Sequence, residues 1–144
     1  MNTLHDNVKK ALERLPDFNF EFRKHQDTQS GVELGPFKYT DGSTYVGEYK
    51  NGLRHGYGEQ IWADGSLYQG FFSEDKCNGK GRLIQSDGDV YQGEWLRDKA
   101  DGYGEFFNAE GSSYRGMWAD DKQNGKGVEI WKDGSEYDGE FINT

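Results

Sequence analysis

The sequence predicts an all-β fold: an elongated, single-layer antiparallel meander of 23-residue β-hairpin repeats, with a short N-terminal α-helix as a cap. Three observations predict this fold. Tyrosine recurs every 23 residues without a gap, at Tyr45, Tyr68, Tyr91, Tyr114 and Tyr137. A glycine follows each of these tyrosines by two positions, and an aromatic residue follows by four. The pattern within a unit therefore alternates with period two, which is typical of a β-strand and not of a helix.

Composition agrees with a thin sheet. Hydrophobic residues make up only 33% of the 144 residues, yet 15% are aromatic, and there are 21 glycines against two prolines. Large flat side chains and regular turns are therefore expected in place of an aliphatic core. The net charge of −9 argues against nucleic-acid binding and disfavours an anionic membrane surface. The single cysteine, Cys77, excludes an internal disulfide framework and is compatible with a reducing compartment. No apolar run approaches the ~20 residues that span a bilayer, so we expect an intracellular protein.

Residues 1–34 do not repeat and form the first predicted region. Apolar residues at helical spacing predict a helix that ends at Pro16, and these residues are Leu4, Val8, Leu12 and Leu15. Three polar residues are candidates to cap its start, namely Asn2, Thr3 and Asp6. Two interpretations of this helix stay open. Either it covers the exposed edge and face of the first hairpin, as terminal repeats require, or it docks on a partner.

The segment that follows the helix predicts a short strand and a linker. Phe18, Phe20 and Phe22 alternate with polar residues, which is the pattern of a strand. Polar residues then predominate from 23 to 31. We expect this stretch to connect the helix to the first repeat.

The second predicted region is the repeat array over residues 35–144. It contains a half unit at 35–44, full units at 45–67, 68–90, 91–113 and 114–136, and a partial unit at 137–144. An array that ends after one strand leaves an unpaired edge, which natural proteins usually cover. We expect this edge either to continue into further chain or to be completed by a partner.

Each unit is predicted to be one hairpin with two kinds of turn. The first strand ends at Asn51-Gly52 in the first unit, and an aspartate replaces that glycine later, at Asp75, Asp98 and Asp121. A Gly-x-Gly pair then lies in the second strand of every unit. An acidic residue followed by glycine supplies the tight turn into the next unit. These turns are Asp64-Gly65, Asp87-Gly88, Glu110-Gly111 and Asp133-Gly134.

These units resemble the membrane occupation and recognition nexus (MORN) repeat. The resemblance rests on Tyr45-Val-Gly-Glu-Tyr-x-x-Gly-x-x-His55-Gly56-x-Gly58 followed by Asp64-Gly65, and it extends over residues 35–144. In later units Asn78, Asp101 and Asn124 stand where the first unit has His55. The resemblance implies a twisted single-layer sheet that serves as a scaffold in ciliary, cytoskeletal or membrane-junction assemblies. Such arrays also accompany lipid kinases and lysine methyltransferases, and several dimerise through a terminal repeat.

The residues offer no catalytic, cofactor-binding or metal-binding arrangement. His5, His25 and His55 lie in unrelated segments, and Cys77 has no histidine nearby in the sequence. The acidic stretch 86–89 lacks the ligand spacing of an EF-hand loop. The Gly-x-Gly pairs have no helix after them, so they are not phosphate-binding loops. We therefore expect no enzyme activity, no cofactor and no metal.

The repeated aromatic residues are the candidate partner-binding site. They are expected to line one face of the sheet, and they are Tyr45, Tyr49, Tyr68, Phe72, Tyr91, Trp95, Tyr114 and Trp118. One interpretation is that they stack on one another as the core. The other is that a single sheet leaves them partly exposed for a helix or extended segment of a partner, because Tyr and Trp are favoured interface anchors.

The sequence thus favours a non-enzymatic scaffold within a multi-subunit assembly, in a cilium (axoneme) or the cytoskeleton, with a possible homodimer through a terminal repeat. One alternative is a phosphoinositide- or membrane-associating module. Its basic residues are scattered through the array at Lys76, Lys80, Arg82, Lys99, Lys122, Lys126 and Lys132. Another alternative is the regulatory region of a larger enzyme such as a lipid kinase.

Overall fold

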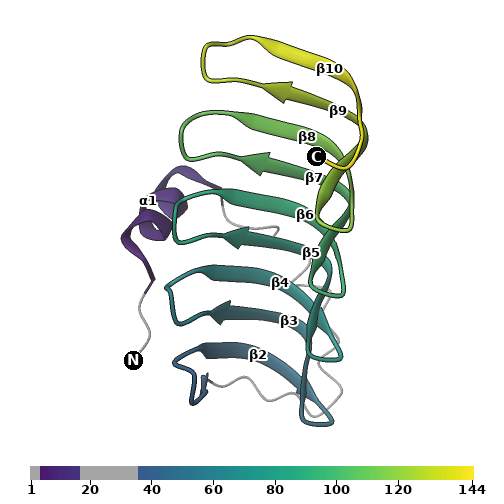
Figure 1. Cartoon of the computed structure of the whole chain (residues 1–144). Helices are drawn as coiled ribbons and strands as arrows, with labels where there is room; N and C mark the ends of the chain where they lie inside the picture. The colour runs from purple at the N-terminus through teal and green to yellow at the C-terminus, as the bar shows by residue number, and fades with distance from the viewer. Residues whose placement is uncertain (1–3, 17–35) are drawn as a thin grey trace.

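The computed structural model describes residues 4–16 and 36–144. Over this part of the chain it confirms the predicted all-β fold, with ten antiparallel strands in one open sheet and one helix. The strands follow one another in chain order, so each pairs only with its sequence neighbours (Figure 1). The elements are α1 (Asp6–Arg14), β1 (Phe37–Lys38), β2 (Thr44–Lys50), β3 (Leu53–Ile61), β4 (Leu67–Ser73), β5 (Lys76–Ile84), β6 (Val90–Leu96), β7 (Lys99–Phe107), β8 (Ser113–Ala119), β9 (Lys122–Ile130) and β10 (Glu136–Phe141).

The hairpin between β2 and β3 turns at Asn51 and Gly52, both of which have positive φ. Two positive φ values in a row define the tight turn that suits the twist of paired strands. Later units place an aspartate at the second position, and its carboxylate accepts a backbone N–H from the preceding unit. Asp98 accepts from Cys77 N at 2.7 Å, and Asp121 accepts from Ala100 N at 2.7 Å. Aspartate replaces glycine because its side chain ties neighbouring hairpins together.

The sheet has two distinct faces because side chains alternate along each strand. The front face carries the repeated aromatic residues, for example Tyr68 and Phe72 with Gly70 between them. The back face carries the alternate residues of the same strand, for example Leu67 and Phe71. Matching glycines face each other across each strand pair, as Gly70 does with Gly81. The predicted period of two is confirmed.

Helix α1 lies on the back face over the middle of the array (Figure 1). Val8 and Ala11 are fully buried in a cluster that also contains Leu67, Ile84 and Val90. The expectation that the helix covers the edge of the first hairpin is therefore wrong. The reason lies in the residue that directly precedes each repeat tyrosine. This residue is aliphatic only before Tyr68 and Tyr91, where it is Leu67 and Val90. The other units have Thr44, Ser113 and Glu136 there.

The ends of α1 are fixed by hydrogen bonds to the sheet. The buried guanidinium of Arg82 donates through Nη1 to the carbonyl of Pro16 at 2.7 Å. At the other end, His5 N donates to the carbonyl of Gly65 at 3.0 Å. His5 is also the N-cap, since its Nδ1 accepts Asn7 N at 3.1 Å. The prediction of Asp6 as the N-cap is therefore wrong by one residue. The other two candidates, Asn2 and Thr3, lie outside the described residues.

The helix ends after Arg14, before Pro16, as predicted. The predicted strand at Phe18–Phe22 and the linker at 23–31 lie outside the described residues. At the two ends of the sheet, β1 pairs only with β2, and β10 pairs only with β9. Within the described ranges no helix is long and apolar enough to cross a bilayer.

Candidate functional site

The aromatic residues of the front face form one continuous series of edge-to-face contacts, which we call the aromatic ladder. Each repeat tyrosine contacts the aromatic residue four positions on, and all but Tyr137 also contact the equivalent residue of the next unit. For Tyr68 the ring centroids lie 5.1 Å from Phe72 and 5.5 Å from Trp95. The same geometry connects Tyr91 with Trp118 at 5.2 Å. Edge-to-face pairs of this kind stabilise a fold beyond their burial alone.

Glycine is what lets each tyrosine ring lie flat on the sheet. A Cβ placed on Gly81 would lie 2.1 Å from the hydroxyl oxygen of Tyr68 and 2.4 Å from its ring carbon Cζ. The Tyr68 hydroxyl in turn donates to the carbonyl of Phe71 at 2.8 Å. Every unit repeats this bond, three residues along its own strand. The hydroxyl therefore explains why the repeat uses tyrosine and not phenylalanine.

The structure confirms that the eight predicted site residues share one face. Six of them are buried, and these are Tyr45, Tyr68, Phe72, Tyr91, Trp95 and Tyr114. Tyr49 and Trp118 are half-buried. The burial favours the first interpretation, in which the ladder is the core of the array. Their contact with a partner stays a prediction, and only the half-buried pair presents much ring surface for it.

Three residues that the repeat did not reveal lie over the ladder. Trp62, Leu83 and Phe106 are partly buried and pack against it. They were missed because their positions vary from unit to unit, so an alignment of period 23 passes over them. Strand alternation was the available signal, since β3, β5 and β7 must present every second residue to the front.

The front face is hollowed around Trp62. A groove of about 250 Å³ runs over the ladder. A second hollow of about 410 Å³ opens toward the first unit, and a third of about 640 Å³ opens toward the acidic turns. Trp62 lines all three. The groove over the ladder is lined by Arg54, Trp62, Tyr68, Phe72, Cys77, Leu83, Trp95 and Asp98.

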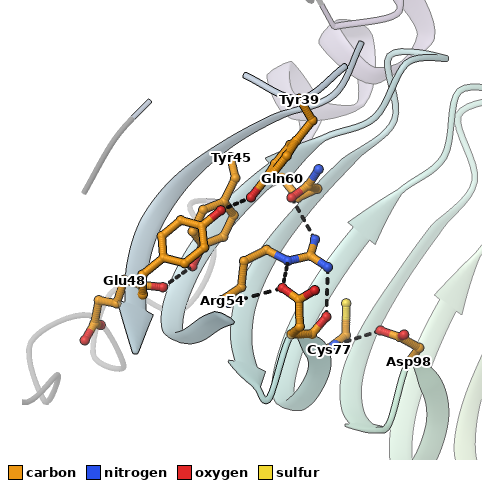
Figure 2. A network of polar contacts seen from close by, with 9 residues as sticks. Tyr39, Tyr45, Glu48, Arg54, Gln60, Cys77 and Asp98 are labelled. Carbon is orange, nitrogen blue, oxygen red and sulfur yellow. Dashed lines mark hydrogen bonds and ion pairs between the residues drawn. The ribbon is translucent and has the colours of Figure 1, made fainter. Parts of the chain in front are cut away.

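Arg54 organises the polar side of this groove (Figure 2). Its Nε lies 2.7 Å from Asp75 Oδ1, and its Nη1 donates to Gln60 Oε1 at 2.9 Å. The guanidinium also lies over the Phe72 ring, 5.0 Å from the centroid. Burial alone would raise the pKa of Asp75, but the hydrogen bonds and charge of Arg54 outweigh it and hold that pKa below its ordinary value. The pair therefore stays ionised and rigid.

Carboxylates border the hollows on both sides. The turn-side hollow is lined by Asp41, Asp64 and Asp87, and the opposite rim carries Asp75 and Asp98. An apolar floor between acidic rims suits a ligand that combines apolar with basic groups. Burial raises the pKa of the Cys77 thiol, so it is protonated at neutral pH and acts as a small apolar side chain. Among the described residues no group of His, Cys, Asp and Glu is arranged to hold a metal ion.

Three lysines of the array share a rim, because Lys76, Lys99 and Lys122 each begin a strand at the same end of the hairpins. Each lies beside acidic turn residues, and Lys99 pairs with Asp120 at 2.9 Å. Across these three turns the acidic residues outnumber the basic ones, five to four. The rim therefore carries no positive stripe of the kind that an anionic membrane attracts.

Alkaline pH is expected to unfold the array cooperatively. Burial raises the pKa of Tyr45, Tyr68 and Tyr91 above the ordinary value of about 10 that tyrosine has when unfolded. The fold thus favours the protonated rings, and their contribution to stability is complete below pH ~10 and is lost as pH rises above it. Tyrosinate absorbance and circular dichroism should change together in one steep transition. Separate titration of tyrosines near pH 10 with an unchanged sheet would contradict this.

Comparison with known families agrees with the repeat seen in the structure. The family model of the MORN repeat matches four consecutive segments, at residues 45–67, 68–90, 91–113 and 114–136. These segments cover more than half of the chain. No curated protein matches the sequence. On its repeat sequence and its fold together, the chain belongs to the MORN-repeat family.

Proposed function

We propose that this protein is a non-enzymatic scaffold whose front face binds a segment of a partner protein, and that the segment is apolar and basic. The observation that carries the proposal is the position of Trp62. It lies where three hollows of the front face meet, with acidic rims on both sides. Binding is centred on the first two full units.

The apolar floor supplies the affinity. A single-layer sheet has no second layer to cover its front face, so Trp62 and Leu83 keep part of their surface accessible above the ladder. Large aromatic side chains in hollows are the residues that most often dominate a protein interface. A helix or extended segment that places apolar side chains against Trp62 would bury this surface from water.

The acidic rims supply the choice of partner. Asp64 and Asp87 line the neighbouring hollow toward the acidic turns, and Asp98 lines the groove itself. Lysine or arginine side chains on the edges of the bound segment would face them. Rim charges mainly accelerate association and exclude acidic competitors, so binding should weaken as salt screens them.

The rigidity of the array favours binding of a partner. Asp75, Asp98 and Asp121 tie each hairpin to the one before, and the ladder runs through every unit. A surface that is ordered before binding loses little entropy when the partner docks. The proposed setting is a ciliary or cytoskeletal assembly, in line with the scaffolds that the repeat resembles. Imaging of the tagged protein in ciliated cells would test that setting.

Replacing Trp62 with alanine is expected to lower partner binding at least tenfold while the sheet stays folded, because the central floor residue of the groove is lost. The array offers a matched control, since Trp131 occupies the same repeat position three units later and lies outside these hollows. Pull-downs from the native source would compare wild type, Trp62→Ala and Trp131→Ala. Equal recovery of the same partners by all three would contradict the proposal. Binding to anionic vesicles that Trp62→Ala leaves unchanged would favour the membrane alternative.

A further inference from the structure

The back face carries a row of side chains whose chemistry repeats every second unit. The row crosses the strands near the hairpin turns that lie opposite α1. Successive strands contribute Glu48, Tyr57, Phe71, Lys80, Glu94, Tyr103, Met117, Lys126 and Glu140. The period is 46 residues, twice that of the repeat. Glycines, turns and the aromatic ladder follow the shorter period. Glu48 and Glu94 also accept the backbone N–H groups of Tyr57 and Tyr103, at 3.1 and 3.4 Å. Phe71 and Met117 replace these glutamates in the units between, so a single hairpin does not require the carboxylate.

Strand register makes this row a series of directly opposed pairs. An apolar pair, Tyr103 and Met117, lies opposite across β7 and β8. On one side of it Glu94 of β6 faces Lys80 of β5, and on the other Lys126 of β9 faces Glu140 of β10. Apolar pairs and pairs of opposite charge therefore alternate along the row.

The part of the row from β6 to β9 is open at the surface. Tyr103 is 47% exposed and Met117 is 41% exposed, although both are apolar residues in the middle of a sheet. Tyr57 occupies the equivalent position two repeats earlier in the chain, and it is only 6% exposed. Glu94 and Lys126 on either side of the open pair are exposed as well. A cluster of large apolar side chains at this exposure usually marks an interface.

We infer that this part of the back face is a self-association surface, and that its occupant is a second copy of the same chain. The charges identify the occupant. From β6 to β9 the row is acidic, apolar, apolar and basic. A second copy whose row runs in the opposite direction therefore places a basic residue against the acidic one, and apolar residues against the apolar pair. A two-fold axis parallel to the strands, between β7 and β8, places Glu94 of each copy on Lys126 of the other. The same rotation stacks Tyr103 of each copy on Met117 of the other, in an interface that is identical on both sides.

The neighbouring row on the back face has the same symmetry. Glu105 of β7 and Arg115 of β8 lie directly opposite and form an ion pair at 3.4 Å. The same two-fold axis brings Glu105 of one copy over Arg115 of the other, and the reverse. A two-fold axis perpendicular to the strands would instead oppose like charges within each row. The charge pattern thus selects one orientation of the pair.

Helix α1 leaves room for this arrangement. It covers the strand ends near the acidic turns, at Ile61, Ile84 and Phe107. The row lies four residues further along each strand, roughly 13 Å away at the usual rise per residue. Because the axis lies between β7 and β8, α1 of each copy faces β8 to β10 of the other copy and not the other helix, so the two sheets diverge from the row toward the acidic turns. The front faces of both copies then point outward, so the dimer offers two grooves and gains avidity for a partner with repeated segments.

Sedimentation velocity of the full chain over a wide concentration range tests the inference. The wild type should be a reversible dimer of roughly micromolar affinity, because the patch is smaller than a standard interface. Glu94→Lys and Lys126→Glu should each weaken the dimer tenfold or more, since each variant opposes like charges twice. A mixture of the two variants should restore dimers, because both contacts between positions 94 and 126 then join opposite charges. A wild type that stays monomeric at every concentration would overturn the inference.

Matched charge reversals separate the surface from a general effect of net charge. Lys50→Glu and Glu74→Lys make the same changes in exposed residues at the turns between β2 and β3 and between β4 and β5, beyond the strands that the second copy covers. They should leave the dimer unchanged, alone and mixed. Circular dichroism should be the same for all four variants. If the mixture of Glu94→Lys and Lys126→Glu dimerises no better than each variant alone, the two-fold pairing is wrong.

Discussion

Replacing Gly81 with alanine is expected to destabilise the protein by about 3–5 kcal/mol, as much as losing a large core side chain. The added methyl group would lie 2.1–2.5 Å from three atoms of the Tyr68 side chain. Tyr68 is fully buried and cannot move aside without giving up its hydrogen bond to Phe71 O and its contacts in the ladder. The backbone at Gly81 does not have positive φ, so the cost is steric and not conformational.

Urea unfolding followed by circular dichroism measures this effect, and Gly134→Ala is the control. Gly134 has φ of +90° with nothing within 4 Å of an added Cβ, so its replacement should cost only about 1–2 kcal/mol of backbone strain. A double-mutant cycle sharpens the test. In a Tyr68→Ala background the ring is gone, and Gly81→Ala should cost almost nothing more. Additive losses in the cycle would contradict the steric explanation.

The repeat made the sheet predictable from the sequence. A period of 23 with alternation inside each unit determines the number of strands, their order and which side chains share a face. The role of Asp98 could not be predicted from the sequence to the same extent. Turn chemistry explains why aspartate tolerates that position, but only the register between units shows its carboxylate on Cys77 N. The hydroxyl bond of Tyr68 to Phe71 O is hidden from the sequence for the same reason.

The parts that the sequence did not reveal are those that break the repeat. Leu67 and Val90 create the site for α1, yet in an alignment of units they look like ordinary variation at a strand position. Trp62 likewise has no counterpart in the units that begin at Tyr68 and Tyr91. Repeating positions encode the sheet and non-repeating positions encode its surfaces. A search for periodicity therefore finds the first set and passes over the second.

Replacing Trp95 with alanine is expected to cost about 3–5 kcal/mol of stability, because the structure places this residue in the core. Its ring lies 5.5 Å from Tyr68 and 5.1 Å from Tyr91, and its Nε1 donates to the carbonyl of Gly81 at 3.1 Å. The loss would interrupt the ladder between two units, so the array should unfold at lower urea concentration as a whole. Trp131→Ala, at an exposed tryptophan, should change stability by less than about 0.5 kcal/mol.

The conservative variant Trp95→Phe separates a core role from a binding role. Phe72 and Phe141 occupy the same repeat position and make the same ring contacts, so phenylalanine should fit at position 95 with a loss of only about 1–2 kcal/mol from the missing hydrogen bond and volume. If Trp95 serves the core, partner binding by the folded Trp95→Phe variant should equal that of wild type. A variant with wild-type stability and weakened binding would instead show that the partner reads the Trp95 ring directly. The ladder would then be a contact surface in its own right, and Trp62 would lose its place as the centre of the groove.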